Sequence, residues 1–249
     1  MEKRYLVAMI GCLMVVASAF AGPAHRLDQL TYLSENSPPM NFLDNGEFKG
    51  IAVDLLERTT RVAGTPVHRD KVKILPWARA YRAAISGPNK VIFAIYRTPE
   101  REALFKWAGP FDANSLVLVA KKNRKIKITQ LSQLNKFVVG AQREDAAEIH
   151  LRNLSLDEMV LTLTVSPLQL ARMMQADRID IWAGGVHGIN AHLAMIGAAP
   201  EDFEVVGTLH KADLYFAFSR DVDDALVDRF QQSLEKVLSQ QAGATKASH

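Results

Sequence analysis

The chain has 249 residues, of which 30 are Lys or Arg and 27 are Asp or Glu. The formal net charge of +3 at pH 7 is too small to favour nucleic acid or an anionic membrane as a partner. This length is sufficient for one large domain or for two small lobes, each with its own core.

The N-terminus has the pattern of a secretory signal peptide. Lys3 and Arg4 precede an apolar run that is too short to span a bilayer and ends in small residues up to Ala21. We therefore expect residues 1–21 to be removed and the protein to be exported to the periplasm. The single cysteine, Cys12, lies in a stretch that faintly resembles a lipoprotein cleavage site, so a lipid anchor there is the alternative. A mature chain without cysteine excludes thiol catalysis and Cys-based metal sites.

Strands and helices alternate along the first half of the mature chain. Apolar runs bounded by Pro or Gly predict the strands, and apolar residues spaced for one helix face predict the helices. The expected strands cover residues 30–33, 72–75 and 91–96, and the expected helices cover residues 51–62 and 77–85. This order indicates an α/β architecture with a largely parallel sheet.

The alternation of strands and helices resumes in the second half of the chain. An apolar strand at 115–120 leads into a basic run at 121–125, where we place the change of lobe. Asp145 and Glu148 have the spacing of a helix N-terminal capping box. The further expected strands cover 137–140, 159–165, 179–183, 203–209 and 214–219, with helices at 128–134, after Asp145, after Ser166, at 187–196 and near the C-terminus. Residues 240–249 are small and polar, and we expect them to be disordered.

Two arginines follow the strand at 91–96. Arg97 and Arg101 would lie at the carboxyl end of that strand, which is where ligands bind in open α/β sheets. A guanidinium matches a carboxylate or phosphate through two parallel hydrogen bonds, so the pair predicts the floor of an anion-binding pocket. The alternative is that both are solvated surface charges.

Three motifs resemble the periplasmic solute-binding proteins of polar amino-acid importers, family 3. They are Pro38-Pro39-Met40-Asn41-Phe42, Pro76-Trp77-Ala78-Arg79 and Thr98-Pro99-Glu100-Arg101. The resemblance implies the two-lobed type II periplasmic-binding-protein fold, in which each lobe has a mainly parallel sheet flanked by helices. Two hinge crossings would join the lobes, with the ligand in the cleft between them. The implied division is 22–118 and 210–239 for lobe 1, and 119–209 for lobe 2.

The resemblance also implies a ligand site. Arg101 matches the arginine that clamps a ligand carboxylate, and Ala94 and Tyr96 match ligand-contacting positions. The other expected ligand-binding residues are Ser34, Glu35, Asn36, Trp77, Arg97, Gln142, Arg143, Asp145, Gly184 and Gly185. Arg97 and Arg143, if they face each other across the cleft, would favour an acidic ligand.

The second lobe departs from the family pattern. The family's aspartate for a ligand ammonium falls at or next to Gly185, and Glu144, Asp145 or Glu35 would have to replace it. This departure leaves room for a small anion or another polar metabolite in place of a standard amino acid.

The expected function is capture of a small polar, anionic or amino-acid-like solute for delivery to an ABC importer. The protein would act as a monomer, and the membrane subunits of the transporter would be its partners. The alternatives are a dehydratase-like periplasmic enzyme and a ligand-sensing partner of a membrane receptor. Glu35, Asp145 and His187 are candidate acids or bases for an enzyme, but each also has an ordinary structural role. We expect no catalytic residue, no cofactor and no metal, because His187 and His192 are not spaced as helical metal ligands.

Overall fold

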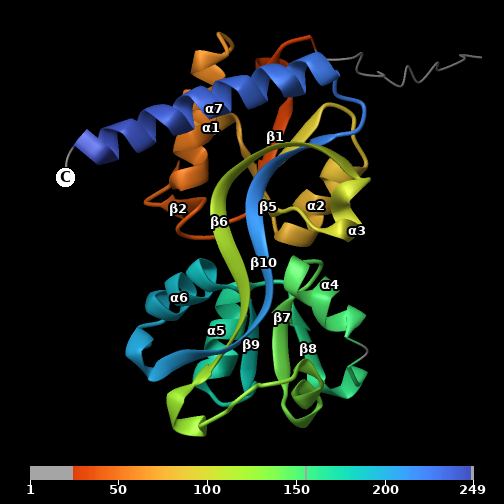
Figure 1. Ribbon diagram of the computed structural model, residues 1–249, viewed down its shortest axis with the longest axis vertical. Helices are drawn as coiled ribbons and strands as arrows, with labels where there is room; N and C mark the ends of the chain where they lie inside the picture. The colour runs from red at the N-terminus through yellow and green to blue at the C-terminus, as the bar shows by residue number, and fades with distance from the viewer. Residues whose placement is uncertain (1–24, 155, 248–249) are drawn as a thin grey trace, which may run out of the picture.

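The computed structural model describes residues 25–154 and 156–247. The predicted signal peptide and Cys12 lie outside these residues. Two α/β lobes are joined by two long strands that run side by side between them (Figure 1). This arrangement confirms the α/β, two-lobed fold class that the sequence predicts.

Lobe 1 contains the N-terminal elements together with the C-terminal helix. Its strands are β1 (Thr31–Ser34), β2 (Phe42–Asp44), β3 (Glu47–Lys49), β4 (Lys73–Ile74) and β5 (Lys90–Tyr96). Its helices are α1 (Ile51–Val62), α2 (Trp77–Ile85), α3 (Pro99–Glu102) and α7 (Asp224–Ala247). β1 pairs in parallel with both β4 and β5, and α7 packs against α1 (Figure 1).

Lobe 2 repeats this pattern on the far side of the crossing strands. Its strands are β7 (Val139–Gln142), β8 (Leu161–Thr164) and β9 (Ile181–Gly185). Its helices are α4 (Ala146–Asn153), α5 (Pro167–Gln175) and α6 (Val186–Met195). β7 pairs in parallel with both β8 and β9. Short 3-10 helices cover Leu27–Gln29, Arg69–Lys71, Lys122–Arg124, Leu131–Lys136, Glu158–Val160 and Pro200–Asp202.

The crossing strands β6 (Phe105–Lys121) and β10 (Phe203–Ser219) are longer than the sequence predicts. They pair antiparallel from Phe105 opposite Ser219 to Lys121 opposite Phe203, so strands expected separately at 203–209 and 214–219 form one. The polar residues between those segments do not end the strand, because β6 satisfies their backbone hydrogen-bonding groups where both strands leave the lobes. The strand order is β4-β1-β5-β10-β6-β9-β7-β8.

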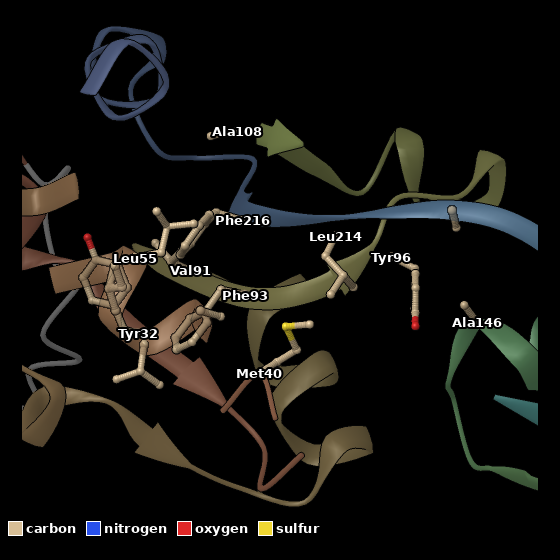
Figure 2. Packing of buried hydrophobic residues seen from close by; sticks show 14 of the residues in the cluster. Tyr32, Met40, Leu55, Val91, Phe93, Tyr96, Ala108, Ala146, Leu214 and Phe216 are labelled. Carbon is tan, nitrogen blue, oxygen red and sulfur yellow. The ribbon is translucent and has the colours of Figure 1, made fainter. Parts of the chain in front are cut away.

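A cluster of phenylalanines holds β5 and β10 against α7 in lobe 1. Phe216 of β10 is fully buried, with its ring centroid 5.6 Å from Phe93 and 4.8 Å from Phe230. Figure 2 shows Phe93 and Phe216 among these core side chains, and shows Tyr96 farther along, on the side facing Ala146 of lobe 2. A second cluster, which includes Leu170, Trp182 and Leu193, forms in lobe 2.

Two local predictions differ from the structure. The helix expected at 128–134 is a 3-10 helix at Leu131–Lys136. α7 continues to Ala247, whereas the sequence predicts disorder from residue 240; Ala, Gln and Lys in this stretch are strong helix formers, which favours its continuation. No helix among the described residues is long and apolar enough to cross a membrane.

Candidate functional site

A cavity of about 70 Å³ lies between the two lobes, where the carboxyl ends of strands from both lobes meet. One water needs roughly 10–15 Å³ of such space, so the cavity has room for a small solute. Eight of the thirteen residues predicted from the sequence line it: Glu35, Trp77, Ala94, Tyr96, Gln142, Asp145, Gly184 and Gly185.

Each of these residues is positioned by the end of a strand or the start of a helix. In lobe 1, Glu35 follows β1, and Ala94 and Tyr96 lie at the end of β5. In lobe 2, Gln142 ends β7 and Asp145 is the N-cap of α4, where its Oδ2 accepts the backbone N–H of Ala147 at 3.2 Å. Strand ends therefore build the site, as expected for open α/β sheets.

The predicted capping box is only half formed. Asp145 caps α4, but Glu148 accepts from the backbone N–H of Glu144 rather than from the N–H of the N-cap residue. Glu144 has a left-handed backbone, with φ of 62°. Glu148 thereby holds the turn that directs the Glu144 carbonyl toward lobe 1.

Two carboxylates from opposite lobes face the cavity. The Nε2 of Gln142 donates to Oε2 of Glu35 at 2.8 Å, which links lobe 2 to lobe 1. Burial raises the pKa of Glu35 to about 7; the charge of Asp145 adds to this effect, and the hydrogen bond from Gln142 opposes it. Burial also raises the pKa of Asp145, against the opposing charge of Arg101. The lining is therefore acidic in character.

Aromatic and histidine side chains complete the walls. Trp77 comes from lobe 1 and Trp182 from lobe 2, and both are buried. The Nδ1 of His192 lies 2.7 Å from the carbonyl oxygen of Gly188, and burial lowers the pKa of His192. A neutral His192 that donates from Nδ1 keeps its Nε2 as an acceptor.

Arg101 does not line the cavity, although the resemblance gives it the role of ligand clamp. It is fully buried, with its guanidinium carbon 5.4 Å from the Trp77 ring centroid and 4.9 Å from that of Tyr81. Its Nη1 donates to the Tyr96 carbonyl at 3.2 Å, and its Nη2 donates to the Glu144 carbonyl in lobe 2 at 2.8 Å. Arg101 thus connects the two lobes directly.

The structure does not bring Arg97 and Arg143 together. Arg97 pairs with Glu102, and its guanidinium carbon lies 5.6 Å from the Trp107 ring centroid. Arg143 is exposed on lobe 2, and neither residue lines the cavity. The acidic ligand expected from this pair therefore has no support in the geometry.

Ser34 and Asn36 also lie outside the lining. Ser34 is completely buried at the end of β1. Asn36 is exposed, and its Oδ1 accepts the backbone N–H of Leu43 at 3.1 Å.

Glu144 is the centre of further contacts between the lobes. Its carbonyl also accepts from Nε1 of Trp77 at 2.9 Å, and its carboxylate pairs with Arg82 on α2. Nearby, Nδ2 of Asn153 donates to Oε1 of Glu100 at 2.7 Å. These contacts close the cleft on the side of α2 and α4.

Several lining residues were not predicted from the sequence: Pro38, Met40, Asn41, Asn114, Pro167, Trp182, Ala183, Gly188, Ile189, His192 and Leu214. His187, which the sequence offers only as a candidate acid or base, also lines the cavity. Met40 and Asn41 belong to the family motif at residues 38–42, so this motif could have indicated them as site residues. Asn114 is a polar residue in a crossing strand. His187 and His192 are five residues apart, but both border the cavity. Among the described residues, no group of three or more His, Cys, Asp or Glu side chains could hold a metal ion.

Comparisons with known proteins agree with this architecture. Residues 30–244 match the family model of bacterial extracellular solute-binding proteins, family 3. A histidine kinase sensor domain with similarity to periplasmic binding proteins is 20% identical, with a TM-score of 0.74, 88% of this chain covered and 93% of that one. The arginine-, lysine-, histidine-binding protein ArtJ from Geobacillus stearothermophilus is 14% identical, with a TM-score of 0.73 and coverage of 85% and 90%.

A third similar structure is a substrate-binding protein of an ABC uptake transporter from Streptococcus pneumoniae with bound histidine. It is 18% identical, with a TM-score of 0.70, and the match covers 84% of this chain and 87% of that one. At these identities the structural matches show the fold, and the family model covers most of the chain. The chain therefore belongs to the bacterial extracellular solute-binding proteins of family 3, and it is a binding protein rather than an enzyme.

Proposed function

We propose that this protein captures a small polar solute carrying a positively charged nitrogen and delivers it to an ABC importer. The observation that carries this proposal is the charge of the cavity. Glu35 and Asp145 reach it from opposite lobes, and none of the described residues that line it is Lys or Arg. An anion would meet two carboxylates there, whereas a cation would be held between them.

The walls of the cavity also suit a cation. Trp77, Tyr96 and Trp182 are among its lining residues, and aromatic side chains attract cations. Two of the similar structures, ArtJ and the pneumococcal protein, have ligands with basic side chains by their descriptions. Their fold similarity makes ligands of this charge a reasonable first test for this chain.

A thermal-shift screen of the mature chain tests the ligand class. The panel contains basic amino acids, amines, dicarboxylates, neutral amino acids and sugars. A ligand at about 100 times its dissociation constant adds about 2.7 kcal/mol to the free energy of unfolding. We expect cationic nitrogen compounds to raise the unfolding temperature and dicarboxylates to leave it unchanged. Stabilisation by dicarboxylates alone would overturn the proposal.

Delivery to an importer requires that the protein is exported and that it binds the membrane subunits. The liganded protein must also differ in conformation from the empty protein. The family is extracellular, and closure of the two lobes on a ligand would produce this conformational difference. We expect the protein in the periplasm as a monomer. Deleting its gene should abolish uptake of the ligand that the screen identifies, and unchanged uptake would show that the protein serves another partner.

A further inference from the structure

The arginine expected to hold a ligand carboxylate is occupied by the protein itself. Arg101 is fully buried, and its Nη1 and Nη2 donate to the carbonyls of Tyr96 and Glu144. Because the Glu144 carbonyl comes from lobe 2, closing the cleft places a protein acceptor on the guanidinium. The Nε of Arg101 is buried without a hydrogen-bond partner among the described residues, and Arg101 does not line the cavity.

Two aromatic rings of lobe 1, Trp77 and Tyr81, also flank Arg101. Trp77 lines the cavity, and its ring centroid lies 5.4 Å from the guanidinium carbon. The same Trp77 donates from Nε1 to the Glu144 carbonyl at 2.9 Å. Three groups, the Trp77 indole, the Arg101 guanidinium and the Glu144 carbonyl, therefore form one hydrogen-bonded unit beside the cavity.

Carboxylates are the charged groups among the acidic and basic side chains that line the cavity, together with two histidines, and none of these lining residues is Lys or Arg. Asn41 also lines the cavity, and its Oδ1 is inaccessible and accepts from no donor within the described part of the chain. Asn41 is only 1% exposed, and its Nδ2 donates a hydrogen bond to the Glu35 carbonyl at 2.7 Å. A buried acceptor without a donor costs free energy, so Asn41 is a polar group of the cavity wall that the protein leaves unsatisfied.

We propose that the cavity is a site for small organic amines without a carboxylate group, and that Arg101 joins the lobes instead of binding the ligand. The ammonium group lies between Glu35 and Asp145. This inference rests on the proposed function and narrows its ligand class. It separates this chain from a binder of α-amino acids, whose carboxylate needs a cationic or donor partner.

The test uses matched pairs of compounds that differ by one carboxylate. We would titrate the mature chain by calorimetry at pH 8 with agmatine and arginine, cadaverine and lysine, and histamine and histidine. We expect at least one amine to bind, and to bind at least tenfold tighter than its parent amino acid. Equal or tighter binding of the parents would overturn the inference while leaving the proposed function intact.

A failure of the proposed function gives a different result. If none of the six compounds binds and dicarboxylates or sugars from the wider panel do, both the inference and the proposed function are wrong. A third result is that none of the six binds but another cationic nitrogen compound does. If that compound carries a carboxylate, the inference is overturned; if it carries none, the inference is supported. The pairs are measured on the unaltered protein, so no outcome depends on whether a variant folds.

A variant then tests which group holds the amine. Glu35→Gln keeps the size of the side chain and removes its charge, and we expect it to weaken amine binding at least tenfold. The matched control is Glu201→Gln, because Glu201 is an exposed carboxylate in the Pro200–Asp202 turn and does not line the cavity. Amine affinity that is unchanged in a folded Glu35→Gln protein would overturn the assignment of this carboxylate.

Discussion

A Cβ atom at Gly185 would lie 2.1 Å from the hydroxyl oxygen of Tyr96. Tyr96 ends β5 in lobe 1, and Gly185 ends β9 in lobe 2, so this approach joins the strand ends of the two lobes across the cleft. The resemblance implies an aspartate at or next to this position in the family. Here the space that such a side chain would need is taken by the tyrosine.

Gly185→Ala should therefore oppose closure of the lobes. A methyl group within 2.1 Å of a buried hydroxyl must displace Tyr96 or hold the cleft partly open. We expect ligand affinity to fall about tenfold or more, and the radius of gyration of the liganded protein, measured by small-angle X-ray scattering, to increase.

Gly188→Ala is the matched control for this change. Gly188 also lines the cavity, but the nearest atom to a Cβ there, Oγ of Ser37, is 3.9 Å away. Tyr96→Phe in the Gly185→Ala background removes the contacting oxygen and should restore part of the lost affinity. Full affinity in the Gly185→Ala single variant would show that the lobes close without this contact.

Binding of a cationic ligand should depend on pH through Glu35. Because the pKa of Glu35 is raised to about 7, the carboxyl is largely protonated at pH 6 and largely ionised at pH 8. A cation binds the ionised form, so its affinity should fall roughly tenfold from pH 8 to pH 6. Calorimetric titration at the two pH values measures this change, and Glu35→Gln should abolish the dependence.

The same ionisation affects stability in the opposite direction. A carboxyl whose pKa is raised by folding contributes stability that is fully present below its unfolded pKa and lost as pH rises through about 7. Without added ligand, the unfolding temperature of the protein should therefore decrease between pH 6 and pH 8. A smaller decrease in Glu35→Gln would assign the effect to this residue, and an identical decrease would assign it elsewhere.

The ion pair between Arg82 and Glu144 should contribute modestly to closure. It crosses the cleft, but the Arg82 side chain is 70% exposed, and exposed pairs contribute about 0–1 kcal/mol. Glu144→Gln should weaken ligand binding by no more than about fivefold, with a smaller effect at high salt. Glu102→Gln is the matched control, because its pair with Arg97 lies within lobe 1. Equal losses in both variants would argue against a role in closure.

Stability of lobe 1 should depend strongly on Phe216. Its ring is fully buried and contacts Phe93, Phe111 and Phe230. Phe216→Ala should lower the free energy of unfolding by about 3–5 kcal/mol, because it leaves a cavity in the core. Met159→Ala, at a side chain that is 90% exposed, should change it by less than about 0.5 kcal/mol. Denaturant unfolding of both variants measures these changes in the free energy of unfolding.

The order of the elements could be predicted from the sequence, and so could the edge of the sheet that forms the site. Apolar periodicity located α1 and α2 correctly, and the strands that end at Tyr96 and Gln142 carry predicted site residues to their carboxyl ends. These features depend on local patterns, because the alternation of apolar and polar residues reflects which face each element buries. The motifs around Pro38, Trp77 and Arg101 also indicated the family that the family model confirms.

The sequence by itself thus determined the two-lobed α/β fold and the strand ends that meet at the cleft. Only the tertiary structure decided which charges face the cavity. Arg97, Arg101 and Arg143 follow strand ends in the sequence, but Arg97 pairs with Glu102, Arg101 binds the Glu144 carbonyl and Arg143 is exposed. The direction of a long side chain depends on partners distant in the sequence, and the cross-lobe partner of Arg101 exists only when the lobes are together.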